Sequence, residues 1–250
     1  MPLEQAKQLI LKAKNISIIP SQTNEPESLT AALALFYTLK ELRKNVNLIV
    51  EGFPEKIKFL TPSVDFISTP KNFVISIPKN VADVSQIYYE KNEEHLKIHL
   101  STEKGTLKKE QISFYYAEAK PDLVITVGIR DFKKELENTL DSFGFLLGSP
   151  ILNIDTANSP VENKKFGSVN LLEDKSISEI TASLIKSVDE KLIVKNSADC
   201  LLSGLILYYE NFQSQKTNPG IFKMSSELME KGADYHAIVH NLNGTTKKVI

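Results

Sequence analysis

The sequence contains a single cysteine, Cys200, among 250 residues. One thiol cannot form a disulfide within the chain and cannot build a structural zinc site by itself. Stability must therefore come from a buried core, and the chain is long enough to bury one. Cys200 precedes the apolar pair Leu201 and Leu202 and has no neighbouring histidine or cluster of positive charge. We interpret it as a buried, unreactive thiol.

An excess of either charge is also missing. The 30 lysines and arginines are balanced by 31 aspartates and glutamates, for a formal net charge of −1. The net charge therefore gives no overall electrostatic attraction for nucleic acid or an anionic membrane. Any nucleotide binding must depend on a local group of charged residues. A composition of 42% hydrophobic and 24% charged residues is typical of globular proteins and excludes a disordered tail or a fibrous repeat.

Long apolar runs are absent, and none approaches the length needed to span a bilayer. The first residues, MPLEQAKQLILKAK, have the pattern of an amphipathic helix and lack the apolar stretch and small-residue cleavage site of a secretory signal. Together with the lone cysteine, these features predict a cytoplasmic protein without membrane partners.

Residues 15–50 predict the fold class. NISIIP (15–20) reads as a short buried strand, LTAALALFYTLKELRK (29–44) repeats apolar residues at helical spacing, and NVNLIV (45–50) reads as a second strand. Strand, helix and strand in that order open a βαβ unit, which requires a parallel sheet with a right-handed crossover. We predict one α/β domain over residues 1–250, with a mainly parallel sheet flanked by helices.

Residues 80–118 interrupt this pattern with three alternating runs, VSQIYYEK, HLKIHLST and QISFYYA, separated by turn-rich segments. Such runs predict an antiparallel β-meander inserted into the domain. NFVISIP (72–78) before it and PDLVITVGI (121–129) after it are predicted as buried strands. The α/β pattern then continues with a strand at 150–157 and helices at 177–188, 198–212 and 220–234, the last ending at Gly232.

Ligands of open α/β sheets bind beyond the carboxyl ends of the strands. The loops predicted there are residues 21–28, 128–131, 155–159 and the stretch around 208–218. Three segments that include residues of these loops resemble blocks of a known protein family. They are PSQTNEPESLTAALAL (20–35), NIDTANSPVENKKFGSVNLLEDKSISEITASLI (153–185) and LLSGLILYYENFQSQKTNPGIFKMSSELMEKGAD (201–234).

In order and context these blocks resemble the DHH phosphoesterase superfamily, particularly its branch of nanoRNases and 3′-phosphoadenosine-5′-phosphate phosphatases. The similarity runs from the first strand to about residue 242. It implies the fold of the DHH N-terminal domain. Active members of the branch continue into a C-terminal substrate domain with a Gly-Gly-Gly-His-type motif, which we expect to be absent from this chain.

The family hydrolyses phosphoesters with two divalent ions, usually manganese, held by clustered aspartates and histidines. By resemblance, this chain has Ser21 at the position of the family's opening histidine. It has Glu25 and Glu27 in place of the Asp-x-Asp pair, and Gly128 in place of the central aspartate. The Asp-His-His triplet is Asp155, Thr156 and Ala157, and the final Asp-Thr is Tyr208 and Tyr209. We take these positions as a vestigial ligand cleft.

Three carboxylates remain in that cleft, Glu25, Glu27 and Asp155. They are enough to hold one Mn²⁺ or Mg²⁺ weakly but cannot reproduce a bridged two-metal centre. Each also has a structural interpretation, because acidic residues cap helix starts and strand-end loops. His236 and His240 are interpreted as a surface pair, and His95 and His99 as exposed positions of the insertion.

Three functions follow as hypotheses. The leading one is a catalytically inactive DHH-like protein that binds a phosphate-containing small molecule, a short nucleic acid or a protein partner. The second is a metal-dependent phosphoesterase acting on short oligonucleotides or nucleoside bisphosphates through Glu25, Glu27 and Asp155, with further groups such as Asp131 converging on them. The third is an assembly role, in which residues 80–118 self-associate or bind a protein through exposed edge strands.

Overall fold

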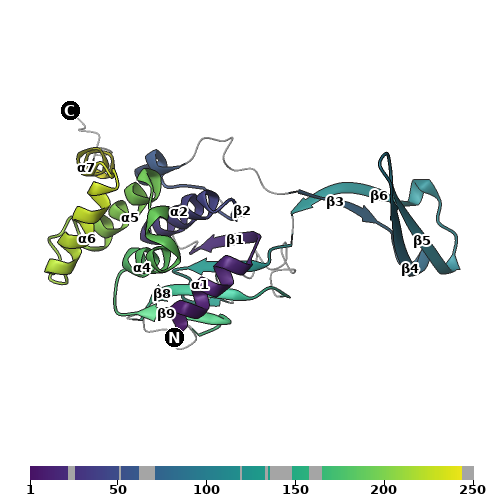
Figure 1. Ribbon diagram of the computed structural model, residues 1–250, viewed down its shortest axis with the longest axis horizontal. Helices are drawn as coiled ribbons and strands as arrows, with labels where there is room; N and C mark the ends of the chain where they lie inside the picture. The colour runs from purple at the N-terminus through teal and green to yellow at the C-terminus, as the bar shows by residue number, and fades with distance from the viewer. Residues whose placement is uncertain are drawn as a thin grey trace. The chain divides into compact units, whose positions relative to one another are not determined.

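The computed structural model describes residues 1–21, 26–50, 52–61, 71–118, 120–132, 135, 148–157 and 165–243, without the side chains of 71–73 and 115–118. The chain divides into two compact units (Figure 1). Unit 1 comprises Met1–Thr69 and Lys120–Ile250, and unit 2 comprises Pro70–Ala119.

Unit 1 is built on a five-stranded parallel sheet in the order β2-β1-β7-β8-β9. The strands are β1 (Asn15–Pro20), β2 (Asn45–Leu48), β7 (Leu123–Val127), β8 (Ile151–Thr156) and β9 (Val169–Glu173). The central strand β7 reads LVITV and is buried along its whole length, as a parallel strand covered on both faces must be. The predicted α/β class and parallel sheet are confirmed.

Helices cover the sheet and each other (Figure 1). They are α1 (Pro2–Lys12), α2 (Pro26–Glu41), α4 (Ile177–Asp189), α5 (Lys195–Tyr208), α6 (Pro219–Glu230) and α7 (Tyr235–Asn243), with short 3₁₀ turns η1 (Glu55–Leu60) and η5 (Glu190–Leu192). Helix α2 contacts β1, β7, α4 and α5, so it lies inside the molecule. Its sequence PESLTAALALFYTLKE accordingly buries residues all round the helix rather than on one stripe. No described helix is long and apolar enough to cross a membrane.

Local signals place the helix ends. Ser176 begins α4 as its N-cap, accepting the Glu179 amide at 3.1 Å, while the Glu179 carboxylate accepts the Ser176 amide at 3.0 Å. This reciprocal capping box is the Ser-x-x-Glu pattern of the sequence. Gly232 follows α6 with φ +98°, the left-handed conformation expected of a glycine after a helix.

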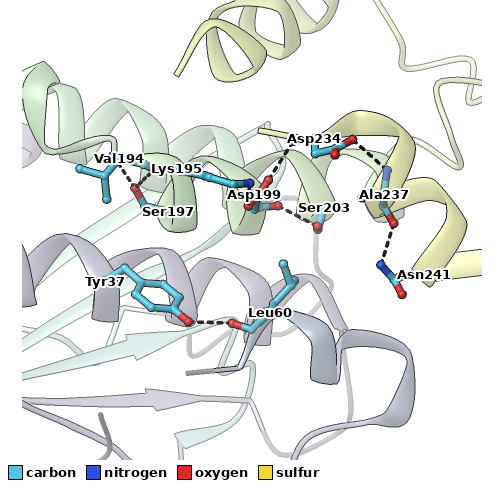
Figure 2. A network of polar contacts seen from close by, with 10 residues as sticks. All are labelled: Tyr37, Leu60, Val194, Lys195, Ser197, Asp199, Ser203, Asp234, Ala237 and Asn241. Atoms are coloured by element: carbon cyan, nitrogen blue, oxygen red, sulfur yellow. Dashed lines mark hydrogen bonds and ion pairs between the residues drawn. The ribbon is translucent and has the colours of Figure 1, made fainter. Parts of the chain in front are cut away.

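A polar network joins the last helices of unit 1 (Figure 2). Asp199 of α5 accepts the backbone amide of Asp234 at 2.9 Å and pairs with Lys195 at 2.8 Å. Asp234 in turn accepts the amide of Ala237, at the start of α7, at 3.0 Å. The network holds the connection between α6 and α7 against α5.

Unit 2 differs from its predicted form. Strand β3 (Lys71–Ser76) pairs with β6 (Ser113–Glu118), and β4 (Ala82–Lys91) pairs with β5 (Leu96–Gly105), as two separate antiparallel pairs. The third alternating run therefore closes back on NFVISIP and does not extend a three-stranded meander.

The prediction of NFVISIP as a buried strand is also wrong. Ile75 is exposed on β3, and the strand takes no part in the parallel sheet. Its KNFVIS sequence includes a lysine, an asparagine and a serine, which a strand covered on both faces would have to bury without partners.

Candidate functional site

Three neighbouring strands end side by side at the carboxyl edge of the sheet. Pro20 of β1 pairs with Val127 of β7, which pairs with Ile154 of β8. The next residue of each strand is a predicted site position, so Ser21, Gly128 and Asp155 stand in one row. Backbone hydrogen bonds extend the register, with the Ser21 amide 2.8 Å from the Val127 oxygen and the Gly128 amide 2.9 Å from the Ile154 oxygen.

Gly128 cannot be replaced by a larger residue without displacing its surroundings. Its φ is +70°, and a Cβ atom there would lie 2.0 Å from the Ser28 hydroxyl oxygen and 3.1 Å from the Ile177 side chain. Ser28 belongs to the first turns of α2, and Ile177 begins α4. The starts of both helices therefore fill the space into which an aspartate at position 128 would have to project.

Glu135 is a residue of this edge that sequence reasoning missed. Its carboxylate accepts the Ser21 hydroxyl at 2.6 Å and the backbone amides of Arg130 and Asp131 at 2.8 and 3.3 Å. Ser21 itself is buried. The contact joins the end of β1 to the segment after β7. The only sequence signal for this contact is an acidic residue a few positions past the end of the strand.

Glu27 reaches from α2 to the beginning of α4. Its carboxylate accepts the Ser178 amide at 3.2 Å, which is one of the amides that the first turn of α4 leaves without a helical partner. The capping interpretation of Glu27 thus has a direct contact behind it, and this contact caps α4. Glu25 lies outside the described residues.

Asp155 is buried at the end of β8, and one of its carboxylate oxygens accepts the amide of Thr156 at 2.8 Å. Ala157 donates its amide to the Glu173 oxygen of β9 at 2.7 Å. Asp155 therefore contacts the backbone of its own strand end. The sequence also offers Asp155 as a cap for the loop that contains Asn158 and Ser159, and these two residues lie outside the described part of the chain.

Two adjacent tyrosines stand at the end of α5, and their rings contact each other edge to face, 4.9 Å apart between ring centres. The buried Tyr209 donates its hydroxyl to the Glu179 carboxylate at 2.6 Å, and burial together with this carboxylate raises the pKa of Tyr209. Tyr208 is half-buried, and the Lys216 ammonium lies 3.2 Å from its hydroxyl and 5.1 Å from its ring centre. That hydrogen bond raises the pKa of the exposed Lys216, and Glu27 and Asp174 contribute in the same direction.

A strained turn places Lys216 beside Tyr208. Glu210, Asn211 and Phe212 follow α5 with φ values of 51°, 55° and 64°, three consecutive non-glycine residues in the left-handed region. Such residues cost roughly 1–2 kcal/mol each and persist only where packing requires them. Here the Phe212 ring packs against Phe222 at 5.5 Å and Tyr235 at 6.4 Å, measured between ring centres.

The described donors do not suit a pair of divalent ions. No three described histidine, cysteine, aspartate or glutamate side chains gather so that they could hold a metal. Gly128 offers no ligand and no room for one, and Glu27 already binds a helix amide. Asp131 contributes its backbone amide to Glu135 at 3.3 Å.

The remaining candidates lie elsewhere. His236 and His240 are exposed on α7, as predicted. His95 is exposed next to Glu94, while His99 is half-buried, stacked on Tyr88 at 4.6 Å and 3.7 Å from Glu90. Cys200 is fully buried in α5, and burial raises the pKa of its thiol, which confirms the prediction of a buried thiol.

Comparison with known proteins yields structural neighbours only. No protein-family model matches the sequence, and no curated protein matches it. The fold is similar to that of an exopolyphosphatase-related protein from Bacteroides fragilis, with a TM-score of 0.68 and 17% identity over 99% of this chain. The chain spans 61% of that protein's length.

Two manganese-bound RecJ structures also match at 14% identity over 97% of this chain. One is from Thermus thermophilus (TM-score 0.44, 31% of its length), and the other, an exonuclease, has a TM-score of 0.47 over 55% of its length. The TM-score of 0.68 shows that this chain shares the fold of the Bacteroides protein.

Proposed function

We propose that this chain, which has the DHH-type fold, has lost two-metal hydrolysis and binds a phosphate-containing ligand at the carboxyl edge of its sheet. The observation that carries the first half is the packing of Ser28 against Gly128, where an added Cβ would approach the hydroxyl to 2.0 Å. The space for a central metal ligand is occupied by the start of α2.

The other ligand positions support the same proposal. Ser21 donates to Glu135, Glu27 caps α4, and Asp155 binds the amide that follows it. A bridged two-metal centre needs carboxylates and imidazoles directed at the ions and held by a second layer of contacts. The contacts described here join these side chains to backbone amides and to Glu135, and such contacts stabilise the edge of the sheet.

Tyr208 and Lys216 support the second half of the proposal. They replace the family's last metal ligand with an aromatic ring and an exposed ammonium group 5.1 Å from the ring centre. An ammonium group binds phosphate through charge-assisted hydrogen bonds, and a tyrosine ring can stack on a base. The Bacteroides neighbour is described as exopolyphosphatase-related, which is consistent with a phosphate-containing ligand.

The test is a calorimetric titration of 3′-phosphoadenosine-5′-phosphate, and separately of a dinucleotide, into the full chain with EDTA present. We expect binding that Lys216→Ala weakens about tenfold, which corresponds to about 1.4 kcal/mol. Lys12→Ala, which removes an exposed lysine of α1, serves as the matched control and should bind like the wild type. The absence of binding, or equal binding by all three proteins, would reject this ligand site.

The enzyme hypothesis is tested with the same compounds in excess Mn²⁺. Hydrolysis that disappears in a Glu25→Ala, Glu27→Ala variant would establish a rebuilt metal site and replace the present proposal. Hydrolysis no faster than that of the variant agrees with a protein that binds without cleaving.

A further inference from the structure

The β4–β5 pair is a two-stranded ribbon with one apolar face. Its register sets Ile87 opposite Leu100, Tyr89 opposite Ile98, and Lys91 opposite Leu96. Because side chains alternate along a strand, these pairs share a face, while Gln86, Tyr88 and Glu90 share the other with their partners. We call the first set, Ile87, Tyr89, Leu96, Ile98 and Leu100, the apolar face.

The apolar face is open to solvent within the chain. Ile87 is 71% exposed, Tyr89 73% and Leu96 61%. The opposite face is polar and internally paired, with the Tyr88 ring stacked on His99 and the His99 ring 3.7 Å from the Glu90 carboxylate. Two strands alone form a marginal structure in water, and a ribbon of this kind is stabilised by covering its apolar side.

The described side chains of unit 2 leave this face uncovered. Among its side chains that the structure describes, Ala82 is the only buried one. Unit 1 offers no matching surface in its described part either. Of the twelve large hydrophobic side chains exposed among described residues, seven are in unit 2, and the five of unit 1 are spread over the amino terminus, α1, η1 and α6.

The ends of the ribbon differ in charge. Its turn carries Glu90, Glu93 and Glu94 against Lys91 and Lys97. Its open end has a pocket lined by Lys79 and Lys104 together with Asp83 and backbone of the neighbouring residues. Two ribbons packed face to face and antiparallel would place each glutamate-rich turn at the other's lysine-lined pocket, and a two-fold axis makes this contact twice.

We infer that the chain forms a two-fold homodimer by packing the apolar faces of two antiparallel β4–β5 ribbons. An apolar face is self-complementary, which a two-fold contact requires, and the charge difference between the ribbon ends selects the antiparallel arrangement. This inference is independent of the proposed ligand site.

Sedimentation equilibrium of the full chain tests the dimer. We expect a dimer for the wild type and a monomer for Ile87→Glu, with dimerisation weakened on the order of 100-fold because the new carboxylate would be buried without a partner. Gln86→Glu places the same side chain one residue away on the polar face and should remain dimeric. Far-ultraviolet circular dichroism of both variants confirms that each is folded.

A charge reversal tests the arrangement. Glu93→Lys combined with Glu94→Lys should weaken the dimer about tenfold, and adding Lys79→Glu and Lys104→Glu to the same chain should restore it. A monomeric wild type, or an Ile87→Glu protein as dimeric as the wild type, would overturn the inference. Equal loss of dimer in Ile87→Glu and Gln86→Glu would overturn the assignment of the face.

Discussion

At the scale of single residues, adjacent side chains of the site have different tasks, and Tyr208 and Tyr209 illustrate this. Tyr209→Phe removes the hydroxyl that donates to the buried Glu179 carboxylate at 2.6 Å and leaves the Ser176 amide as its remaining donor from the capping box. We expect a loss of about 1–3 kcal/mol in the free energy of unfolding, measured in urea. Tyr208→Phe removes only an exposed contact with Lys216 and serves as the control, with a loss of less than about 0.5 kcal/mol. Equal losses would contradict the assignment of Tyr209 as the structural member of the pair.

The pKa of Tyr209 predicts that the free energy of unfolding depends on pH. Its pKa is raised above the ordinary value of 10.0, first by burial and then by Glu179. The unfolded chain therefore loses this proton at a lower pH than the folded protein. The contribution of this proton to the free energy of unfolding is fully present below pH 10. As the pH rises above 10, the free energy of unfolding falls by up to about 1.4 kcal/mol per pH unit. Urea titrations between pH 9 and pH 11 should show a steeper fall for the wild type than for Tyr209→Phe.

Replacing Glu27 distinguishes its role as a helix cap from a role as a metal ligand. As a cap on the Ser178 amide, its replacement in Glu27→Gln should cost about 1 kcal/mol of stability in EDTA. Glu55→Gln, in the exposed turn η1, removes a carboxylate that pairs only with neighbouring Lys58 and should change stability little. A Glu27→Gln protein of wild-type stability in EDTA, but with a smaller shift of its unfolding temperature on addition of Mn²⁺, would identify a ligand instead.

Some residues of the edge were predictable from the sequence and others were not. Ser21, Gly128 and Asp155 follow three buried runs, and parallel strands in register bring their ends together, so their juxtaposition follows from the pattern. Glu135 carries no such signal. Its place depends on the path of the chain after Gly128, where the φ of +70° redirects the backbone.

At the scale of elements, the packing of α2 on the end of β7 is the decisive contact. Gly128→Ala adds the methyl group that would meet Ser28 and also forces alanine into the left-handed region, so we expect a loss of about 2–4 kcal/mol in urea. Ser28→Gly in the same chain should recover part of that loss. Gly52→Ala is the control, because nothing lies within 4 Å of the added carbon. A Gly128→Ala protein as stable as the control would mean that the edge has room for a larger residue.

Strand prediction succeeded where apolar runs were continuous and failed at β3. LVITV has no polar residue except a threonine, and Thr126 bonds to Asn153 inside the sheet at 2.9 Å. NFVISIP has an asparagine and a serine among its apolar residues, and it pairs with β6 within a separate antiparallel unit. Partner choice of this kind depends on residues 40 positions away, which local periodicity does not encode.

At the scale of the whole molecule, the core of the described residues lies in unit 1, because every cluster of buried hydrophobic side chains consists of unit 1 residues. Residues Lys71 and Glu118 are paired across β3 and β6, so the two ends of the insertion lie next to each other. Replacing residues 71–118 by a short Gly-Ser linker should therefore leave unit 1 folded, with a calorimetric unfolding temperature close to that of the full chain. The shortened chain should also be monomeric. Loss of cooperative unfolding in unit 1 would show that the insertion is part of its core.

We propose that this chain has lost two-metal hydrolysis while it keeps the fold that it shares with the Bacteroides protein. Calorimetric titration of the full chain with Mn²⁺ is the most direct test of this claim, since ion number and affinity are measured without knowledge of the ligand. We predict no pair of ions bound at micromolar affinity, and the same trace for the wild type and for Glu27→Gln. Two Mn²⁺ bound per chain at micromolar affinity, with binding reduced in Glu27→Gln, would contradict the claim.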